Sequence, residues 1–225
     1  MLDSESLADI LTVGDITRHH ARIRPERVAI HYEGQRRTYS ELDRRANRVT
    51  NGLIAEGTRP QARIAYLSKN SPAFFDLWFG AAKADIVLVP INFRLAPPEL
   101  AYVVADAGAE LLFVSADFYP LVEKVAHELK SVRRIIALDG EHASWIGYAQ
   151  WLAGQPDLDP GIAVAREHCA IQMYTSGTTG NPKGAQLSHA SLLTLAPGAL
   201  TQFGAWHDDD VNLVCMPLFH FGGSG

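Results

Sequence analysis

Residues 62–92 read ARIAYLSKNSPAFFDLWFGAAKADIVLVPIN, and this stretch decides the fold. An apolar run at 62–68 is followed by a helical segment from about Ser71 to Ala84, with Pro72 at an early position, and then by a second apolar run at 86–92. Parallel strands need a crossover between them, which is usually a helix. The stretch therefore predicts a strand–helix–strand unit of a parallel sheet.

The same alternation continues on both sides of this unit. Upstream, two short strands flank a polar turn at Gly34, and a helix follows that we expect to be capped by Ser40 and ended by Gly57. Downstream, helices are expected at 99–107 and 118–130, and strands at 110–115 and 133–139. Apolar strands that alternate with amphipathic helices predict an α/β fold, a mostly parallel sheet flanked by helices.

A stretch rich in Gly and Pro interrupts this order at residues 140–165 and is interpreted as a connecting segment. We therefore divide the chain near residue 165. Residues 1–165 are predicted to form an amino-terminal α/β subdomain. Residues 166–225 are predicted to form a phosphate-binding loop and the incomplete start of a second α/β subdomain.

Composition and charge exclude several classes of protein. The chain has 225 residues and a net charge of −5, so it lacks the basic field that binds nucleic acid. Its two cysteines, expected to be buried thiols, are too far apart to suggest a zinc site. No secretory signal or transmembrane segment is predicted, and the cytoplasm is the expected compartment. The face formed by Arg44, Arg45 and Arg48 is interpreted as a solvated helix surface.

The segment Tyr174–Gly184, YTSGTTGNPKG, has the composition of a loop that holds phosphates. Its glycines, Gly184 among them, allow backbone angles that are closed to other residues, so that successive N–H groups can surround anionic oxygens. Ser176, Thr178 and Thr179 add hydroxyl donors, and Lys183 adds a positive charge where negative charge develops on a leaving phosphate. The spacing matches neither the P-loop of nucleotide triphosphatases nor a GxGxxG motif.

The string YTSGTTGNPKG resembles, residue for residue, the phosphate-binding signature of the adenylate-forming superfamily, which includes acyl-CoA synthetases, luciferases and the adenylation domains of peptide synthetases. Residues 24–53, RPERVAIHYEGQRRTYSELDRRANRVTNGL, and 88–115, LVPINFRLAPPELAYVVADAGAELLFVS, resemble the blocks that precede it in the same superfamily. The resemblance thus covers most of the chain, and it implies the amino-terminal part of the adenylate-forming enzyme fold.

The resemblance implies a two-step reaction. A carboxylic acid and ATP give an acyl-adenylate and pyrophosphate, and a thiol, coenzyme A in the acyl-CoA synthetases, then takes the acyl group. Mg²⁺ is expected to accompany ATP, although its ligand is not identifiable from the sequence. Carried over by position, the residues that hold the phosphates are Thr175, Ser176, Gly177, Thr178, Thr179, Gly180 and Lys183.

Residues 212–225, NLVCMPLFHFGGSG, resemble the next block of acyl-CoA synthetases, where an aromatic residue and a histidine before two glycines line the acid pocket. The corresponding residues are Phe219, His220, Gly222 and Gly223. The resemblance thus gives Lys183 and His220 the catalytic positions, with His220 orienting the acid. A carboxylic acid is already ionised at neutral pH, so no base is required.

Two further residues are assigned structural roles. His189 is interpreted as a histidine at the start of a helix that is satisfied by backbone groups. Asp85 stands where relatives usually have a helix-ending Gly, in a left-handed position that Asp tolerates.

Complete members of the superfamily are about twice as long as this chain, so we expect a truncated acyl-CoA synthetase that is inactive as it stands. Two alternatives stay open. The first is another adenylate-forming enzyme, an activator of aryl acids or amino acids, and the second is a short non-catalytic binding or assembly protein. The expected partners are a small carboxylic acid, ATP and coenzyme A, and a homodimer is allowed.

Overall fold

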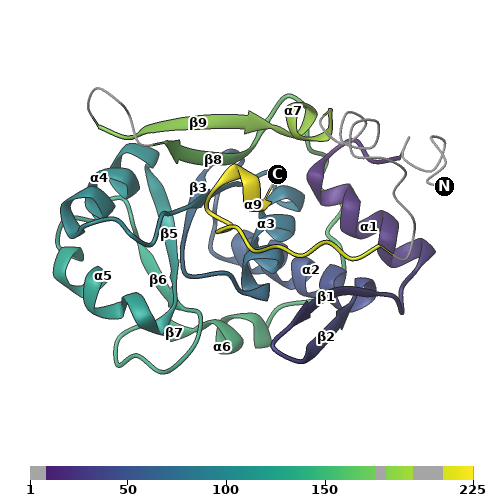
Figure 1. The fold of residues 1–225 in the computed structure, drawn as a ribbon, viewed down its shortest axis with the longest axis horizontal. Helices are drawn as coiled ribbons and strands as arrows, with labels where there is room; N and C mark the ends of the chain where they lie inside the picture. The colour runs from purple at the N-terminus through teal and green to yellow at the C-terminus, as the bar shows by residue number, and fades with distance from the viewer. Residues whose placement is uncertain (1–8, 176–180, 195–209, 225) are drawn as a thin grey trace.

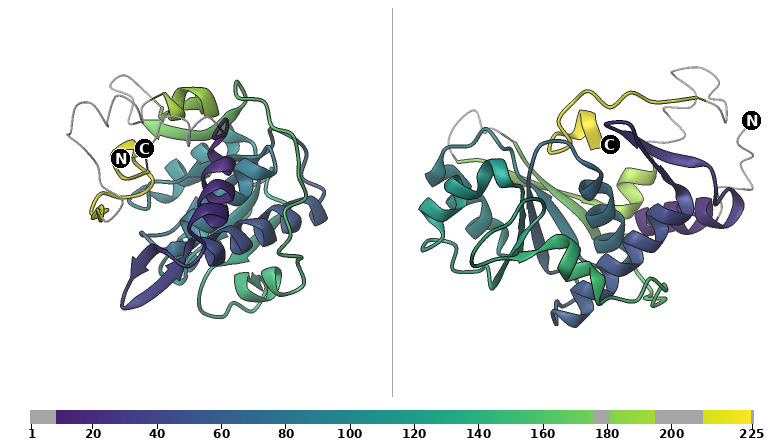
Figure 2. Two further views of the ribbon diagram at one scale, coloured as in Figure 1. Left: turned by 90° about the vertical axis from the view of Figure 1, so that its right-hand side faces the viewer. Right: turned by 90° about the horizontal axis from the view of Figure 1, so that it is seen from below.

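A computed structural model describes residues 9–175, 181–194 and 210–224. A sheet stands at its centre, with its described strands in the order β7-β6-β5-β3-β4-β8-β9 and helices on both faces (Figure 1). The pairs within this sheet are parallel, except that β8 and β9 are antiparallel. This arrangement confirms the predicted α/β fold. A separate hairpin, β1–β2, projects from the body of the molecule (Figure 2).

The bounds of the elements are as follows. The strands are β1 (Val28–Tyr32), β2 (Gln35–Thr38), β3 (Arg63–Leu67), β4 (Val87–Pro90), β5 (Ala109–Val114), β6 (Arg134–Ala137), β7 (Ile146–Gly147), β8 (Cys169–Thr175) and β9 (Lys183–Ser188). The helices are α1 (Val13–Ile23), α2 (Tyr39–Ala55), α3 (Pro72–Lys83), α4 (Pro97–Ala107), the 3₁₀ turn η1 (Ala116–Phe118), α5 (Tyr119–Val125), α6 (Tyr148–Ala153), α7 (His189–Leu193) and α9 (Phe221–Ser224).

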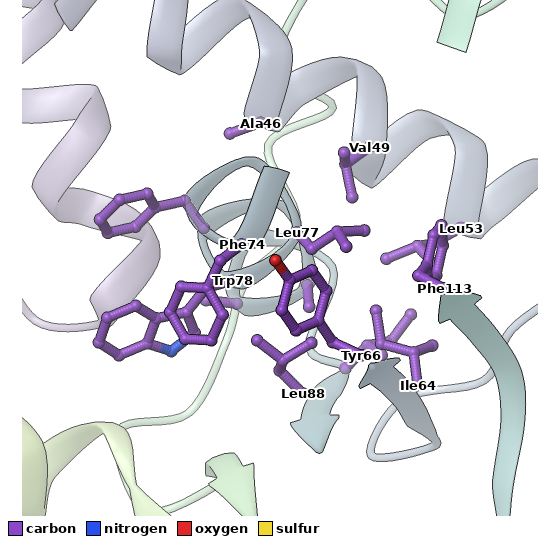
Figure 3. Close-up of a cluster of buried hydrophobic side chains, with 14 of the residues drawn as sticks. Ala46, Val49, Leu53, Ile64, Tyr66, Phe74, Leu77, Trp78, Leu88 and Phe113 are labelled. Atoms are coloured by element: carbon purple, nitrogen blue, oxygen red, sulfur yellow. The ribbon is translucent and has the colours of Figure 1, made fainter. Parts of the chain in front are cut away.

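Alternate side chains of β3 enter two different hydrophobic cores, as the period of two in a strand requires. Ile64 and Tyr66 face a core formed with α1, α2, α3 and α6. Figure 3 shows Tyr66 and Ile64 beside Leu77 of α3 and near Leu53 of α2. Ala65 and Leu67 face the opposite core, which α4 and α5 cover. The sheet is therefore buried on both faces, which explains why its strands read as nearly continuous apolar runs.

Four of the sequence expectations need correction in this part of the molecule. Helix α2 is capped by Thr38, whose hydroxyl accepts a hydrogen bond from the Glu41 N–H, and not by Ser40. Asp43, three residues after Ser40, accepts hydrogen bonds from Lys83 and Asn47. The segment 140–165 contains β7 and α6 and is more than a connection. The cysteines are not both buried, since Cys169 is half-buried and Cys215 is exposed. Helix α5 ends at Val125, before residue 130.

The strands that follow residue 165 join the same sheet as those before it. Strand β8 pairs in parallel with β4 through Leu88 and Ile171, and β9 pairs with β8. The division of the chain near residue 165 stays a prediction. Among the described helices, none is both long enough and apolar enough to span a membrane.

Candidate active site

The carboxyl ends of three neighbouring parallel strands, β3, β4 and β8, lie at one edge of the sheet. The chain after β3 leads to α3, which packs in the first core, whereas the chain after β4 leads to α4, which packs in the second. Adjacent strands whose connections leave toward opposite faces create a crevice, and ligands of open α/β sheets bind in such crevices. The fold therefore predicts a binding site beyond the ends of β3 and β4.

Residues 216–219 occupy this position. The Asn70 side chain donates a hydrogen bond to the Met216 carbonyl (2.9 Å) and accepts one from the Leu218 N–H (2.9 Å). Leu218 is buried in the first core. The rings of Phe219 and Phe93 form a T-shaped contact, with 5.2 Å between the ring centroids. Asn70 follows β3 and Phe93 follows β4. Both loops of the crevice thus hold the segment that carries Phe219 and His220.

Strands β8 and β9 form the two arms of a hairpin at the same edge. Thr175 ends β8, Lys183 begins β9, and the two residues are direct partners in the antiparallel ladder. Both are exposed. Lys183 and Gly184 therefore lie in a strand, not in the loop where the sequence placed them. Five of the predicted phosphate-binding residues, Ser176, Gly177, Thr178, Thr179 and Gly180, lie outside the described residues.

A hydrogen-bonded cluster supports the base of this hairpin. The Tyr174 hydroxyl donates to a carboxylate oxygen of Asp106 on α4 (2.6 Å) and accepts from the Gln172 side-chain amide (3.0 Å). Burial and the neighbouring Asp106 carboxylate raise the pKa of the Tyr174 hydroxyl well above its ordinary value. The hydroxyl therefore stays protonated and keeps donating to Asp106 throughout the physiological pH range.

Gly184 is required at this place for a reason other than the one expected. It is not among the described glycines with a positive φ, so its backbone angles are open to other residues. A Cβ atom added to Gly184 would lie 2.4 Å from the Gln172 side-chain nitrogen and 3.0 Å from the Tyr174 ring. A larger residue here would therefore have to displace the Gln172 side chain and press on the Tyr174 ring.

The turn after Phe219 brings the remaining predicted pocket residues together. His220 is exposed, and its Nδ1 accepts a hydrogen bond from the Gly222 N–H (3.2 Å). A Cβ atom at Gly223 would lie 2.5 Å from the Pro217 carbonyl oxygen, so this turn needs a glycine there. No hydrogen bond or ring contact between described residues links this turn to Thr175 or Lys183. The structure thus places the two groups at one edge of the sheet without joining them.

Three supporting residues were not predicted from the sequence. Asn70 could have been found, because a polar residue directly after an apolar strand lies at the carboxyl edge where ligands bind. Asp106 and Gln172 could not, because each looks like an ordinary polar residue of a helix or strand until its partner is known. The described residues contain no group of three or more His, Cys, Asp or Glu side chains arranged to hold a metal ion.

The two structural assignments agree with the geometry. His189 begins α7, is buried, and its Nδ1 accepts a hydrogen bond from the Val13 N–H (3.2 Å). Asp85 follows α3 with a φ of 58°, the left-handed conformation expected of it. Its carboxylate also bonds His168 (2.9 Å) and the Gln61 side chain (2.8 Å). The start of α7 at His189 and the left-handed conformation of Asp85 are therefore confirmed, and their purely structural roles stay predictions.

Residues 17–224 match the family described as AMP-binding enzyme. The chain belongs to this family. Its solved relatives share the fold just described: the amino-terminal domain of FACL13 from Mycobacterium tuberculosis, crystallised with an inhibitor, aligns with 93% of this chain at 30% identity and a TM-score of 0.84, and 52% of that domain is covered. The anthranilate CoA ligase AuaEII, solved with anthranoyl-AMP, aligns with 84% of this chain at 28% identity and a TM-score of 0.77, and 36% of its chain is covered.

A curated relative is more similar in sequence. The fatty acid–[acyl-carrier-protein] ligase ScoC of Streptomyces coeruleorubidus is 38% identical over 216 residues, which is 94% of this chain and 40% of ScoC. The chain thus spans about two fifths of the length of this relative. The match to the amino-terminal domain of FACL13 shows which part of the family fold these residues form.

Proposed function

We propose that the protein containing this chain activates a carboxylic acid with ATP. In the first step, a carboxylate oxygen bonds to the α-phosphorus of ATP while the bond to pyrophosphate breaks, giving an acyl-adenylate. In the second step, a thiolate attacks the acyl carbon, and AMP leaves as the thioester forms. One observation carries the proposal. Thr175 and Lys183 are paired on the two strands of the signature hairpin, and they lie at the same sheet edge as the segment that carries Phe219.

The residues of the hairpin would bind the phosphates, chiefly the departing pyrophosphate. Lys183 is exposed at the start of β9, where a flexible ammonium group can reach the negative charge that develops on the leaving group. The hydroxyl and backbone donors of the loop would be supplied by Thr175, Ser176, Gly177, Thr178, Thr179 and Gly180. Magnesium bound to ATP would neutralise part of the phosphate charge.

The residues of the turn at 219–223 would bind the acid. Phe219 is half-buried against Phe93 and offers an apolar surface, while the exposed His220 offers a ring nitrogen near the carboxylate end of the pocket. Gly222 and Gly223 would line the pocket through the backbone of this turn. His220 orients the acid and does not remove a proton, because the acid is ionised at neutral pH.

Coenzyme A is the proposed acceptor thiol, in line with the CoA ligase AuaEII. ScoC is a ligase for an acyl-carrier protein, so a carrier-protein thiol is the alternative acceptor that the experiment must include. Activation of amino acids has less support, because the PLFHFGG segment at 217–223 offers no acidic side chain for a substrate ammonium group. The acid is fatty or aromatic, as in the names of these two relatives.

The 225-residue chain alone is proposed to be inactive, because more than half of the length of ScoC has no counterpart in it. Cytoplasm is the proposed compartment, in keeping with two cysteines that are both free. A homodimer is the assembly to be tested, by light scattering of the purified protein.

The test is carboxylate-dependent exchange of labelled pyrophosphate into ATP. It compares the 225-residue chain with the longest natural reading frame that contains it, using a panel of fatty, aromatic and amino acids. Exchange by the longer protein with a fatty or aromatic acid, followed by thioester formation with coenzyme A, is the expected result. Lys183→Ala should reduce the exchange at least tenfold, whereas Lys124→Ala, a lysine on α5, should leave it unchanged.

Other outcomes would overturn particular parts of the proposal. Exchange with amino acids only would replace the acid class, and thioester formation only with a carrier protein would replace the acceptor. If neither protein catalyses exchange with any acid of the panel, the activation step is refuted and a binding or assembly role is favoured. Full exchange by the 225-residue chain alone would refute its inactivity.

A further inference from the structure

Five arginines line one surface cavity, the arginine pocket, which lies between β2, the exposed side of α2 and Asp157. Its volume is about 320 Å³. The arginines are Arg36, Arg37, Arg44, Arg45 and Arg48, and the other lining residues are Glu41 and Asp157. The interpretation of Arg44, Arg45 and Arg48 as a merely solvated helix face is therefore incomplete, because these side chains line a concavity together with the β1–β2 hairpin.

A buried carboxylate holds two of these arginines in place. Asp76 of α3 is fully buried, and its two oxygens lie 2.5 Å from an Arg37 terminal nitrogen and 2.7 Å from Arg45 Nε. Each guanidinium carries five N–H donors and uses only some of them to bond Asp76. Two guanidinium groups are thus fixed in the wall of the pocket with donors left over.

The positive charges of the other three arginines have few acidic partners. Arg48 lies 3.6 Å from the Asp157 carboxylate, and both side chains are partly exposed. Arg36 and Arg44 are exposed and form no ion pair with any residue in the described part of the chain. Glu41 on the rim already accepts a hydrogen bond from the Thr38 N–H. The five arginines therefore lie near only three carboxylates, those of Glu41, Asp157 and Asp76, and Asp76 is buried.

We propose that the arginine pocket binds a small anion that carries two or more phosphate groups. The planar fork of arginine matches phosphate oxygens in pairs, and all the cationic side chains that line this pocket are arginines. A concave wall of one charge concentrates the field, although the whole chain carries −5. The cavity volume stands at the lower end of the range for ligand pockets, which favours a ligand near the size of pyrophosphate.

This pocket is separate from the candidate active site. The β1–β2 hairpin lies on the opposite side of the molecule from β9 in Figure 1, and the left view of Figure 2 shows the same separation. The pocket residues come from β2, α2 and Asp157, none of which contributes to the edge formed by β3, β4 and β8. Phosphate binding here would therefore be independent of Lys183.

The experiment is isothermal titration of the 225-residue chain with inorganic pyrophosphate at low ionic strength. The Arg36→Gln/Arg44→Gln double variant should weaken binding about tenfold or more, since it removes two groups that donate charge-assisted hydrogen bonds. Lys124→Gln/Lys130→Gln, which removes the same charge from the α5 region, should change it less than about twofold, as should Lys183→Ala. Circular dichroism confirms that each variant is folded.

Four results would overturn the proposal. The first is the absence of pyrophosphate binding by the unaltered chain, and the second is binding that Lys183→Ala abolishes and the arginine variant does not. The third is equal loss in both double variants, which would show a general charge effect. The fourth is binding to phosphatidylglycerol vesicles, measured by co-sedimentation, without any binding of soluble pyrophosphate, which would assign the pocket to a membrane surface.

Discussion

Lys183 lies directly opposite Thr175 in the antiparallel ladder of β8 and β9. This pairing brings the first and last polar members of the predicted phosphate-binding set to neighbouring positions at the carboxyl edge of the sheet. A β-ladder fixes its partners more rigidly than a free loop does, because both backbones are hydrogen-bonded. The position of the Lys183 backbone therefore depends on the side chains that support the hairpin, those of Gln172, Tyr174 and Asp106.

Gly184→Ala should destabilise the chain by about 1–3 kcal/mol, because the new methyl group would overlap the Gln172 side chain and press on the Tyr174 ring. Urea unfolding followed by circular dichroism measures this loss. Gly154→Ala is the matched control, since Gly154 has a negative φ and open space around it. An equal effect of the two substitutions would contradict the close-approach explanation.

Tyr174→Phe and Asp106→Ala should each reduce the free energy of unfolding by about 1 kcal/mol, since each removes the hydrogen bond between the hydroxyl and the carboxylate. The double variant should lose no more than the larger single loss, because the two side chains act as a pair. Denaturant titration of the four proteins gives the coupling energy. Additive losses would show that the two residues act independently.

Asn70→Ala should release the segment at 216–218, since it removes both hydrogen bonds that hold Met216 and Leu218. The amide hydrogen of Leu218 should then exchange about tenfold faster, corresponding to a loss of about 1.4 kcal/mol. Asn70→Asp keeps the acceptor for Leu218 and should have a smaller effect. Asn212→Ala, at an exposed position, serves as the control, and an unchanged Leu218 rate in Asn70→Ala would refute the role of Asn70.

Asp159 should make the chain less stable in acid. Burial opposes ionisation, but hydrogen bonds from Arg18 and the Gly161 N–H, and the charge of Lys83, lower the pKa of Asp159 well below its ordinary 3.8. The unfolded chain then binds more protons than the folded chain below about pH 4, so this contribution is complete above that pH and is lost as the pH falls further. Asp159 is partly exposed, so the contribution is about 1 kcal/mol or less.

Thermal unfolding between pH 2.5 and pH 6 checks this prediction. Asp159→Asn should lower the melting temperature at pH 6 and have a smaller effect at pH 2.5, where part of this contribution is lost. Asp117→Asn is the control, because the ion pair of Asp117 with Lys69 is largely exposed on both sides. A constant effect of Asp159→Asn across this pH range would contradict the assignment.

The alternation of strands and helices was predictable because β3, β4 and β5 are apolar runs separated by amphipathic segments. Strand β9 was not, because KGAQLS is polar and largely exposed and becomes a strand only through its pairing with β8. The start of α2 was ambiguous, since both Thr38 and Ser40 are followed three residues later by an acid. In the structure Asp43 accepts a hydrogen bond from Lys83, and Thr38 is the residue that caps the helix.

The candidate site was predictable to the extent that it depends on sequence strings. YTSGTTGNPKG and PLFHFGG named the residues, and the sheet topology places both strings at one edge. The supporting residue Asp106 acts through a partner 68 residues away, so no local pattern could indicate it. The place of Asn70 after an apolar strand indicated the carboxyl edge, but its partners, 146 and 148 residues away, could not be predicted from it. The arginine pocket was not predicted, because two of its seven lining residues come from the β1–β2 hairpin and a third, Asp157, is distant in sequence.

The contacts of Asn70 also set the order in which the molecule can be completed. Its partners follow it by 146 and 148 residues, and His189 bonds a backbone group 176 residues before it. Contacts at such separations close very large loops and form late in folding, since the chain entropy they cost must be offset by structure already present. During synthesis, the two hydrophobic cores around β3–β6 can therefore form first, and the crevice receives its lining only after residue 218 has left the ribosome.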